Sequence, residues 1–144
     1  MKFIPPIKVA MTPFPYSIDV DAPLADADAL MRAHAIRHLP VTEGDKLVGV
    51  VSQRDLLVAR AARPGADVDA EVNVREVHTP DPYVVDLEEA LDNVLAVMAA
   101  RHIGSVLVTR RGKLAGVFTA TDACHHFCNY LRQQFRPSGG DDAA

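Results

Sequence analysis

The chain contains nearly the same seven-residue phrase twice, GVVSQRD at 49–55 and GVFTATD at 116–122. Each copy has glycine first, a hydroxyl residue fourth and aspartate last, namely Gly49, Ser52 and Asp55, then Gly116, Thr119 and Asp122. A constant shift of 67 positions relates the copies, and the same ungapped shift relates MTPFPY at 11–16 to HTPDPY at 78–83. A solenoid needs at least three repeated units to bury its faces. Two copies therefore predict a pair of halves packed on each other as one globular unit.

The composition limits both the size of the core and the kinds of partner. At 144 residues and 49% hydrophobic content, we expect a single module with one ordinary core. The formal net charge of -4 argues against a nucleic-acid partner, because such a partner requires a basic face. No apolar run approaches the roughly 20 residues of a membrane span, and MKFIPPIKVAM lacks the apolar centre of a signal peptide. We expect a cytoplasmic protein with no membrane partner.

Each half is predicted to contain the order strand, helix, strand, strand, helix, which gives an α+β fold with pseudo-twofold symmetry. The predicted segments are short strands at 17–18 and 84–85, helices around 24–31 and 91–98, hairpins of 39–42 with 46–51 and 105–109 with 113–118, and second helices from Asp55 and Asp122. Asp86 and Glu89 have the spacing of a capping box before the helix at 91–98. Its apolar face is predicted to be Leu91, Val94, Leu95 and Met98.

The repeat also divides the chain into segments. We expect a first repeat with the N-terminal segment at 1–63, a linker at 64–71 and a second repeat at 72–136. The linker begins with a polar stretch containing proline and glycine, which suits the surface. The tail at 137–144 contains too little apolar surface to be held down, so we expect it to be disordered.

The repeated phrase has a chemical interpretation beside a structural one. Glycine leaves room for a ligand to approach the backbone, and a hydroxyl at a helix N-terminus is well placed to bind phosphate. An aspartate has two acceptor oxygens that suit paired ribose hydroxyls, so the phrase indicates a nucleotide. The structural alternative is that Ser52 and Thr119 only cap helices, with Asp55 and Asp122 favourably placed in the first turn.

The MTP turn, the RHLPV strand and the glycine-hydroxyl-aspartate phrase occur in this order, and close variants recur in the second half. This pattern resembles a CBS domain, and residues 8–132 together resemble the paired CBS arrangement known as a Bateman module. The resemblance implies two β-α-β-β-α repeats with two clefts between them, commonly assembled as a disc-shaped homodimer. It also implies binding of adenosyl compounds such as AMP, ADP, ATP or S-adenosylmethionine.

The resemblance also assigns residues. Ribose-binding aspartates correspond to Asp55 and Asp122, and phosphate-side hydroxyls to Ser52 and Thr119. Adenine-contacting segments correspond to 12–16 with 36–39, and to 79–83 with 103–106. The predicted ligand-binding set is Thr12, Pro13, Tyr16, Ile36, Arg37, His38, Leu39, Ser52, Arg54, Asp55, Thr79, Pro80, Tyr83, Ile103, Gly104, Ser105, Val106, Thr119, Thr121 and Asp122.

Two departures from the family pattern leave alternatives open. Tyr16 and Tyr83 stand where the family more often has a small aliphatic residue, and each ring could stack on adenine or fill the cleft. The first copy is also more basic. Arg37, His38 and Arg54 correspond to Gly104, Ser105 and Thr121, so the first cleft is predicted to prefer more phosphates, although a solvated basic edge would also explain these residues.

Cys124 and Cys128 are spaced to face one side of a helix and are weak candidates for a metal site. Cys124 corresponds to Leu57, so burial as a small apolar residue is the alternative, and we assign no metal and no cofactor. No nucleophile-elbow, P-loop or dinucleotide-binding motif is present, so an enzyme is not expected. We expect a free-standing regulatory sensor of adenosyl ligands that signals to an effector protein in trans. The principal alternative is a constitutive dimerisation scaffold with vestigial clefts, and a third possibility is a metal- or redox-responsive protein that uses Cys124 and Cys128.

Overall fold

The computed structural model describes residues 2–136. The predicted disordered tail at 137–144 lies outside the described residues. The elements in chain order are η1 (Ile7–Val9), β1 (Thr12–Pro13), β2 (Ile18–Asp19), α1 (Leu24–His34), β3 (His38–Glu43), β4 (Lys46–Ser52), α2 (Gln53–Ala62), α3 (Val68–Glu71), η2 (Val74–Glu76), β5 (Thr79–Pro80), β6 (Val84–Asp86), α4 (Leu91–Arg101), β7 (Ser105–Arg110), β8 (Lys113–Thr119) and α5 (Ala120–Gln134). The predicted α+β class and the order of elements in each half are confirmed.

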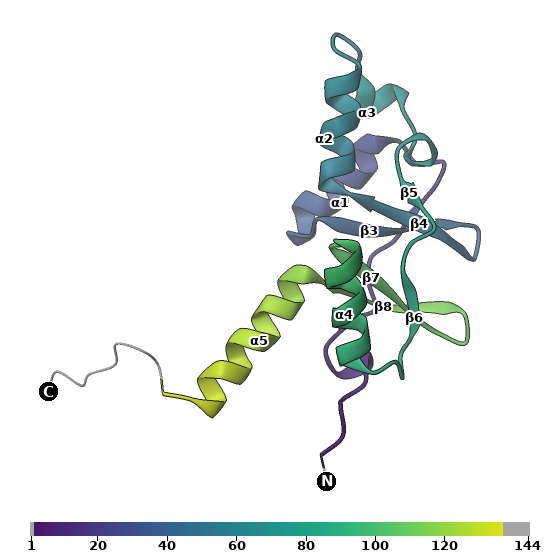
Figure 1. Ribbon diagram of the computed structural model, residues 1–144. Helices are drawn as coiled ribbons and strands as arrows, with labels where there is room; N and C mark the ends of the chain where they lie inside the picture. The colour runs from purple at the N-terminus through teal and green to yellow at the C-terminus, as the bar shows by residue number, and fades with distance from the viewer. Residues whose placement is uncertain (1, 137–144) are drawn as a thin grey trace, which may run out of the picture.

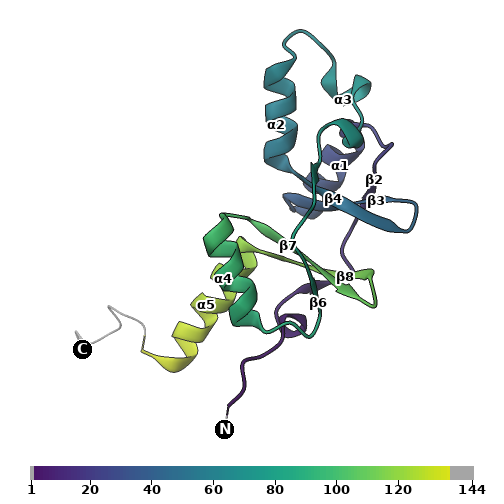
Figure 2. The same ribbon diagram turned by 45° about the vertical axis from the view of Figure 1, so that its right-hand side comes forward.

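The two halves exchange edge strands. One sheet has the order β2-β3-β4-β5 and the other has the order β1-β8-β7-β6. Strand β1, from the turn that begins the first repeat, therefore completes the sheet of the second half, and β5 completes the sheet of the first half. In Figures 1 and 2 the halves stack one above the other, with both hairpins near the middle of the molecule. Neither half forms its four-stranded sheet alone, because one edge strand of each sheet comes from the other half.

The buried apolar residues form two clusters, one for each half, rather than the one core expected from chain length. The exchange extends to these clusters. Ile7, at the start of the chain, is buried in the core of the second half, and Val74, its equivalent under the repeat shift, is buried in the core of the first. The segment before each repeat thus packs with the other repeat.

The region predicted as a linker contains the short helix α3. Its Val68 is buried in the core of the first half, and Asp69 accepts two hydrogen bonds of 2.9 Å from the guanidinium of Arg60 in α2. These contacts hold the start of the connection against the first half. The expected repeat boundaries at 63/64 and 71/72 stay a prediction.

Two local predictions differ from the structure. Asp86 and Glu89 do not form a capping box, since α4 begins at Leu91 and its N-cap residue Ala90 has no side-chain hydrogen bond. Asp86 Oδ2 instead accepts a hydrogen bond from the backbone of Glu88, because the chain turns once more before the helix starts. Leu95, predicted on the buried face, is 39% exposed.

The first half has a shorter edge strand for a reason visible in its sequence. In the second half, the amide of Leu107 donates a hydrogen bond of 2.9 Å to the carbonyl oxygen of Tyr83, and β6 begins with the next residue. The equivalent of Leu107 is Pro40, which has no N–H to donate. Strand β2 therefore begins one position later than β6 under the repeat shift.

The glycines of the repeated phrase make room for the exchanged strands. A Cβ atom at Gly49 would lie 2.5 Å from the carbonyl oxygen of Thr79 in β5 and would also collide with the ring of His78. A Cβ atom at Gly116 would collide with Sδ at the flexible end of the Met11 side chain and would lie 3.0 Å from the carbonyl oxygen of Thr12 in β1. The prediction that these glycines admit a ligand is wrong, because the exchanged segments already occupy the space beside them.

The two glycines should therefore differ in their sensitivity to substitution. Gly49→Ala should lower the free energy of unfolding by about 2–3 kcal/mol, because β5 backbone must move, whereas Gly116→Ala should cost about 1 kcal/mol. Urea denaturation followed by circular dichroism measures both values. Equal costs would contradict close packing of β5 against Gly49 as the reason for that glycine.

Candidate functional site

The candidate site is a pair of equivalent strand–helix junctions. Where β4 meets α2, Ser52 Oγ accepts a hydrogen bond of 3.1 Å from the Asp55 amide, and Asp55 Oδ2 accepts one of 2.8 Å from the Ser52 amide. Where β8 meets α5, Thr119 and Asp122 repeat this arrangement at 3.1 and 2.9 Å. Both junctions are therefore capping boxes, and the structural role considered for the repeated phrase is confirmed.

The capping boxes leave groups free for a ligand. Only one oxygen of each aspartate, Oδ2, takes part in the cap, so within the described residues Oδ1 has no hydrogen-bond partner. The hydroxyls of Ser52 and Thr119 accept a bond in the cap, which leaves the hydroxyl hydrogen able to donate. Each junction thus offers an anionic acceptor and a donor beside the positive end of a helix dipole.

The first strand of each hairpin brings further predicted residues to its junction. The Gln53 amide donates to the Arg37 carbonyl oxygen at 2.9 Å, and the Ala120 amide donates to the Gly104 carbonyl oxygen at 3.0 Å. The segments 36–39 and 103–106 therefore lie beside the capping boxes, as predicted. Their last residues, Leu39 and Val106, are fully buried in the cores, so these two can offer a ligand only backbone groups.

The strand exchange divides the remaining predicted segments between the halves. Thr12 and Pro13 form β1 and pair with β8, in the sheet that carries Thr119. Tyr16 lies two residues before β2 of the first half. In the same way Thr79 and Pro80 pair with β4, whereas Tyr83 lies immediately before β6. Each turn predicted to contact adenine therefore connects the two halves.

The tyrosines of these turns are covered by the ends of the neighbouring helices. The ring of Tyr16 stacks on His34, the last residue of α1, with a centroid separation of 3.7 Å. The guanidinium of Arg101, the last residue of α4, lies 5.5 Å from the centroid of the Tyr83 ring. Burial raises the pKa of Tyr83, and nearby Glu89 raises it further. One face of each ring thus has a protein partner at an equivalent position.

The two halves meet beside His38. The imidazole Nε2 of His38 lies 3.5 Å from where a Cβ atom would stand on Gly104, so the absent side chain lets this ring reach the second half. Burial lowers the pKa of His38, whereas the charges of Asp55 and Asp122 raise it and that of Arg37 lowers it. One imidazole therefore experiences the aspartates of both junctions, which places the junctions near each other.

Both arginines of the predicted ligand-binding set, Arg37 and Arg54, belong to the first junction. Arg37 and Arg54 are exposed, and neither forms an ion pair with another residue of the described chain. Their equivalents, Gly104 and Thr121, are uncharged. The two junctions consequently share one hydrogen-bonding geometry and differ in charge.

The cysteines lie on α5 away from any cluster of further ligands. Cys124 is exposed and Cys128 is half-buried, and across residues 2–136 no three His, Cys, Asp or Glu side chains are grouped to hold a metal ion. The neighbouring His126 instead contacts the Ala10 carbonyl oxygen at 3.1 Å through Nε2. That contact attaches α5 to the segment exchanged from the start of the chain.

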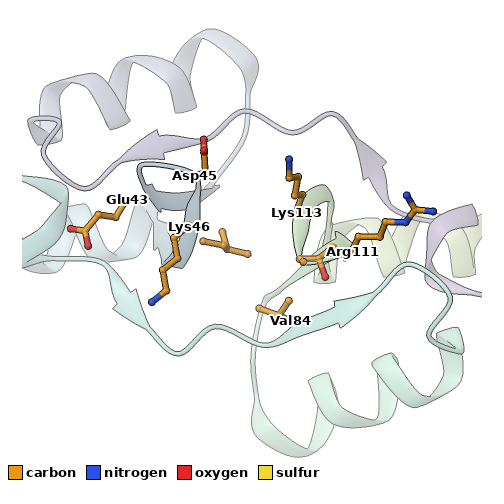
Figure 3. A pocket seen from close by; sticks show the side chains of 9 residues that line it. Glu43, Asp45, Lys46, Val84, Arg111 and Lys113 are labelled. Carbon is orange, nitrogen blue, oxygen red and sulfur yellow. The ribbon is translucent and has the colours of Figure 1, made fainter.

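Sequence reasoning did not find two hollows that lie away from the junctions. One has a volume of about 640 Å³ and lies between the tips of the two hairpins, where Glu43, Asp45, Lys46, Leu47, Val84, Thr109, Arg111, Gly112 and Lys113 line it (Figure 3). The other, of about 620 Å³, lies along α5. The only sequence signal for the first was the equivalence of Lys46 and Lys113 under the repeat shift.

The fold and its paired junctions define a module of two homologous α+β repeats that exchange edge strands. The family model for the CBS domain matches residues 7–62 and 74–128. The chain therefore belongs to the CBS domain family and contains two CBS domains, as the sequence pattern predicted. No helix within residues 2–136 combines the length and the apolar composition needed to cross a membrane.

Proteins similar to this chain include an enzyme, matched in sequence, and a transporter domain, matched in structure. Inosine-5'-monophosphate dehydrogenase of Thermoplasma acidophilum is 37% identical over 108 residues, or 74% of this chain and 20% of that protein. This chain thus spans about a fifth of that relative's length. A Vibrio cholerae structure described as an acetoin utilization protein (AcuB) has a TM-score of 0.79 and 30% identity, covering 94% of this chain and all of that one. The CBS domain of a bacterial CNNM/CorC family Mg2+ transporter, in complex with ATP, has a TM-score of 0.74 and 26% identity over 86% of this chain and 87% of that one.

The lowered pKa of His38 predicts a pH dependence of stability. As the pH falls below about 6.5, the unfolded chain binds a proton at this histidine before the folded chain does. The stabilisation is thus present above about pH 6.5 and is lost as the pH falls through the lower folded-state pKa. His38→Ser, which copies Ser105 of the second half, should reduce the loss of stability between about pH 7.5 and about pH 5.5. Urea denaturation at both pH values measures this, and an unchanged loss in the variant would contradict the assignment.

Proposed function

We propose that this protein is a regulatory module that binds an adenosyl compound at the two strand–helix junctions and signals to an effector protein in trans. The observation that carries the proposal is the pair of equivalent capping boxes, each with an unpaired carboxylate oxygen and a hydroxyl hydrogen at a helix N-terminus. Ribose hydroxyls donate to the former, and phosphate oxygens accept from the latter. The ATP complex of the CNNM/CorC CBS domain, which has the same fold, supports this ligand class.

The signal would come from the angle between the halves. The junctions belong to different halves, and His38 connects them through its contact beside Gly104. A ligand that contacts both halves shifts their arrangement only by its difference in affinity for two arrangements. The exchanged strands restrict these to small rotations, since each sheet contains a strand from the other half.

The principal test uses variants that keep the cap and move the carboxylate. Glutamate is the preferred residue at the third position of a capping box, so Asp55→Glu and Asp122→Glu should keep stability within about 0.5 kcal/mol. Each should weaken ligand binding at its own junction at least tenfold, because the carboxylate moves by one methylene. Thermal unfolding with AMP, ADP, ATP and S-adenosylmethionine measures this. Ligand at about 100 times its dissociation constant raises the free energy of unfolding by about 2.7 kcal/mol when it binds at a single site.

The outcomes separate the sensor from the scaffold. A thermal shift lost in one variant identifies the working junction. No shift with any of the four ligands, in protein freed of bound nucleotide, would favour a constitutive dimerisation scaffold.

The difference in charge between the two junctions is tested separately, with a matched control. Arg54→Ala should weaken ATP more than AMP, whereas Thr121→Ala should change both little, and equal losses for ATP and AMP in Arg54→Ala would contradict a phosphate preference.

A homodimer is part of the proposal because helix α5 has an apolar stripe that no other element within residues 2–136 covers. Within the described residues α5 contains no buried residue, and Figure 1 shows it extending away from the body. Cys124, Phe127, Cys128 and Leu131 share one face at helical spacing, with Phe127 61% exposed. Helix α2, the equivalent helix of the first half, also exposes Leu57 and Val58. A second copy would cover these surfaces in an isologous contact.

The dimer is tested by its dependence on the stripe. Leu131→Glu should convert a dimer to a monomer in sedimentation velocity, because it places a charge in the apolar contact. Asn129→Glu, on another face of the same helix, should leave the dimer intact. Wild-type protein that sediments as a monomer at about 100 μM, which is about 100 times a micromolar dissociation constant, would contradict the assignment.

A further inference from the structure

The hollow between the hairpin tips lies at the other end of the hairpins from the strand–helix junctions. Its walls come from both halves, because Lys46 belongs to β4, Lys113 belongs to β8 and Val84 begins β6. Each hairpin turns through a two-residue loop, Gly44–Asp45 in the first half and Arg111–Gly112 in the second. The hollow is thus a surface separate from the junctions, and both halves contribute to its walls.

The charge on this hollow is unlike that of the chain as a whole. The chain has a formal net charge of -4, yet three cations line the hollow, Lys46, Arg111 and Lys113. None of the three forms an ion pair within residues 2–136. Two carboxylates, Glu43 and Asp45, also line it, but Glu43 is engaged by Arg75. Unpaired cations in a concave surface attract anions.

The positions of the charged groups limit the shape of the anion. In Figure 3 the side chains of Lys46, Arg111 and Lys113 point in different directions, and their charged ends do not converge on one point. A single compact anion would contact one of them at a time, whereas a molecule with two or more linked phosphates could contact several. The side chains of Leu47 and Val84 provide an apolar part of the lining.

Arg111 occupies a turn position that favours other residue types. Arg111 has a φ of 52°, whereas its equivalent in the first hairpin is Gly44, with a φ of 61°. With Gly112 also at positive φ, the second loop has the pattern of a type I′ turn, in which asparagine or glycine is favoured at the first position. An arginine in this conformation costs free energy relative to those residues. Phe14, Ala35, Asp81 and His102 have a similar φ in the described chain, so the cost alone does not single out this loop.

We propose that the hollow between the hairpin tips is a second ligand site, which takes a small molecule carrying two or more linked phosphates. Arg111 and Lys113 from one half and Lys46 from the other bind the phosphates. A ligand held in this way contacts both halves, so it favours one angle between them. The site does not depend on adenosyl binding at the junctions.

Isothermal titration with inorganic pyrophosphate tests the proposal on the full chain. Wild-type protein should bind the probe, and Arg111→Asn should weaken binding at least tenfold while its melting temperature stays equal or rises, because asparagine suits the turn. Lys46→Gln and Lys113→Gln should each weaken binding several-fold. Arg63→Gln, an exposed arginine outside the hollow, is the matched control and should leave the affinity unchanged.

The same titration distinguishes this site from the junctions. If Arg54→Gln abolishes pyrophosphate binding and Arg111→Asn does not, the probe binds at the first junction and the proposal is overturned. Absence of measurable binding to the wild-type protein at millimolar pyrophosphate would also overturn it. Loss of binding in the hairpin variants with Arg54→Gln unchanged supports the second site, whatever the outcome of the adenosyl experiments.

Discussion

The exchange of edge strands between the halves is the contact on which the rest of the structure depends. Strand β5 lies against Gly49 and completes the first sheet, while β1 lies against Gly116 and completes the second. Unpaired sheet edges are unfavourable, and each half closes its own edge with a segment that belongs to the other. The same exchange carries Ile7 and Val74 into opposite cores. The halves therefore fold as one unit and keep a defined orientation.

That orientation gives the junctions their chemistry. A capping box alone stabilises a helix, and the side chains of Ser52 and Thr119 would have this role in any isolated repeat. The exchange brings the two boxes close enough for Asp55 and Asp122 to act on one imidazole, that of His38. Capping and ligand binding are thus compatible uses of the same groups, because the cap fixes one carboxylate oxygen and leaves the other exposed to a donor.

The sequence predicted the elements well because their signals are local. The shift between the repeated phrases placed each hairpin and each second helix, and the phrase itself identified both junctions. The exchange could not be predicted from the shift, since MTPFPY and HTPDPY are equivalent and pairing within or between halves uses the same local residues. The contact of His38 with the second half and the hollow at the hairpin tips depend on that packing, so they too required the structure. The capping box expected at Asp86 failed because spacing alone does not fix where a helix starts.

The central claim is that an adenosyl ligand binds at the paired junctions, and its most direct test is a titration of isotope-labelled protein with AMP followed by amide chemical shifts. A chain of 15.6 kDa gives resolved spectra for such an experiment. The account predicts saturable shifts of the Ser52–Asp55 or Thr119–Asp122 amides, together with those of residues 36–39 or 103–106 at the same junction. Saturable binding whose shifts are confined to α5 or to the hairpin tips, with both junctions unchanged, would contradict it.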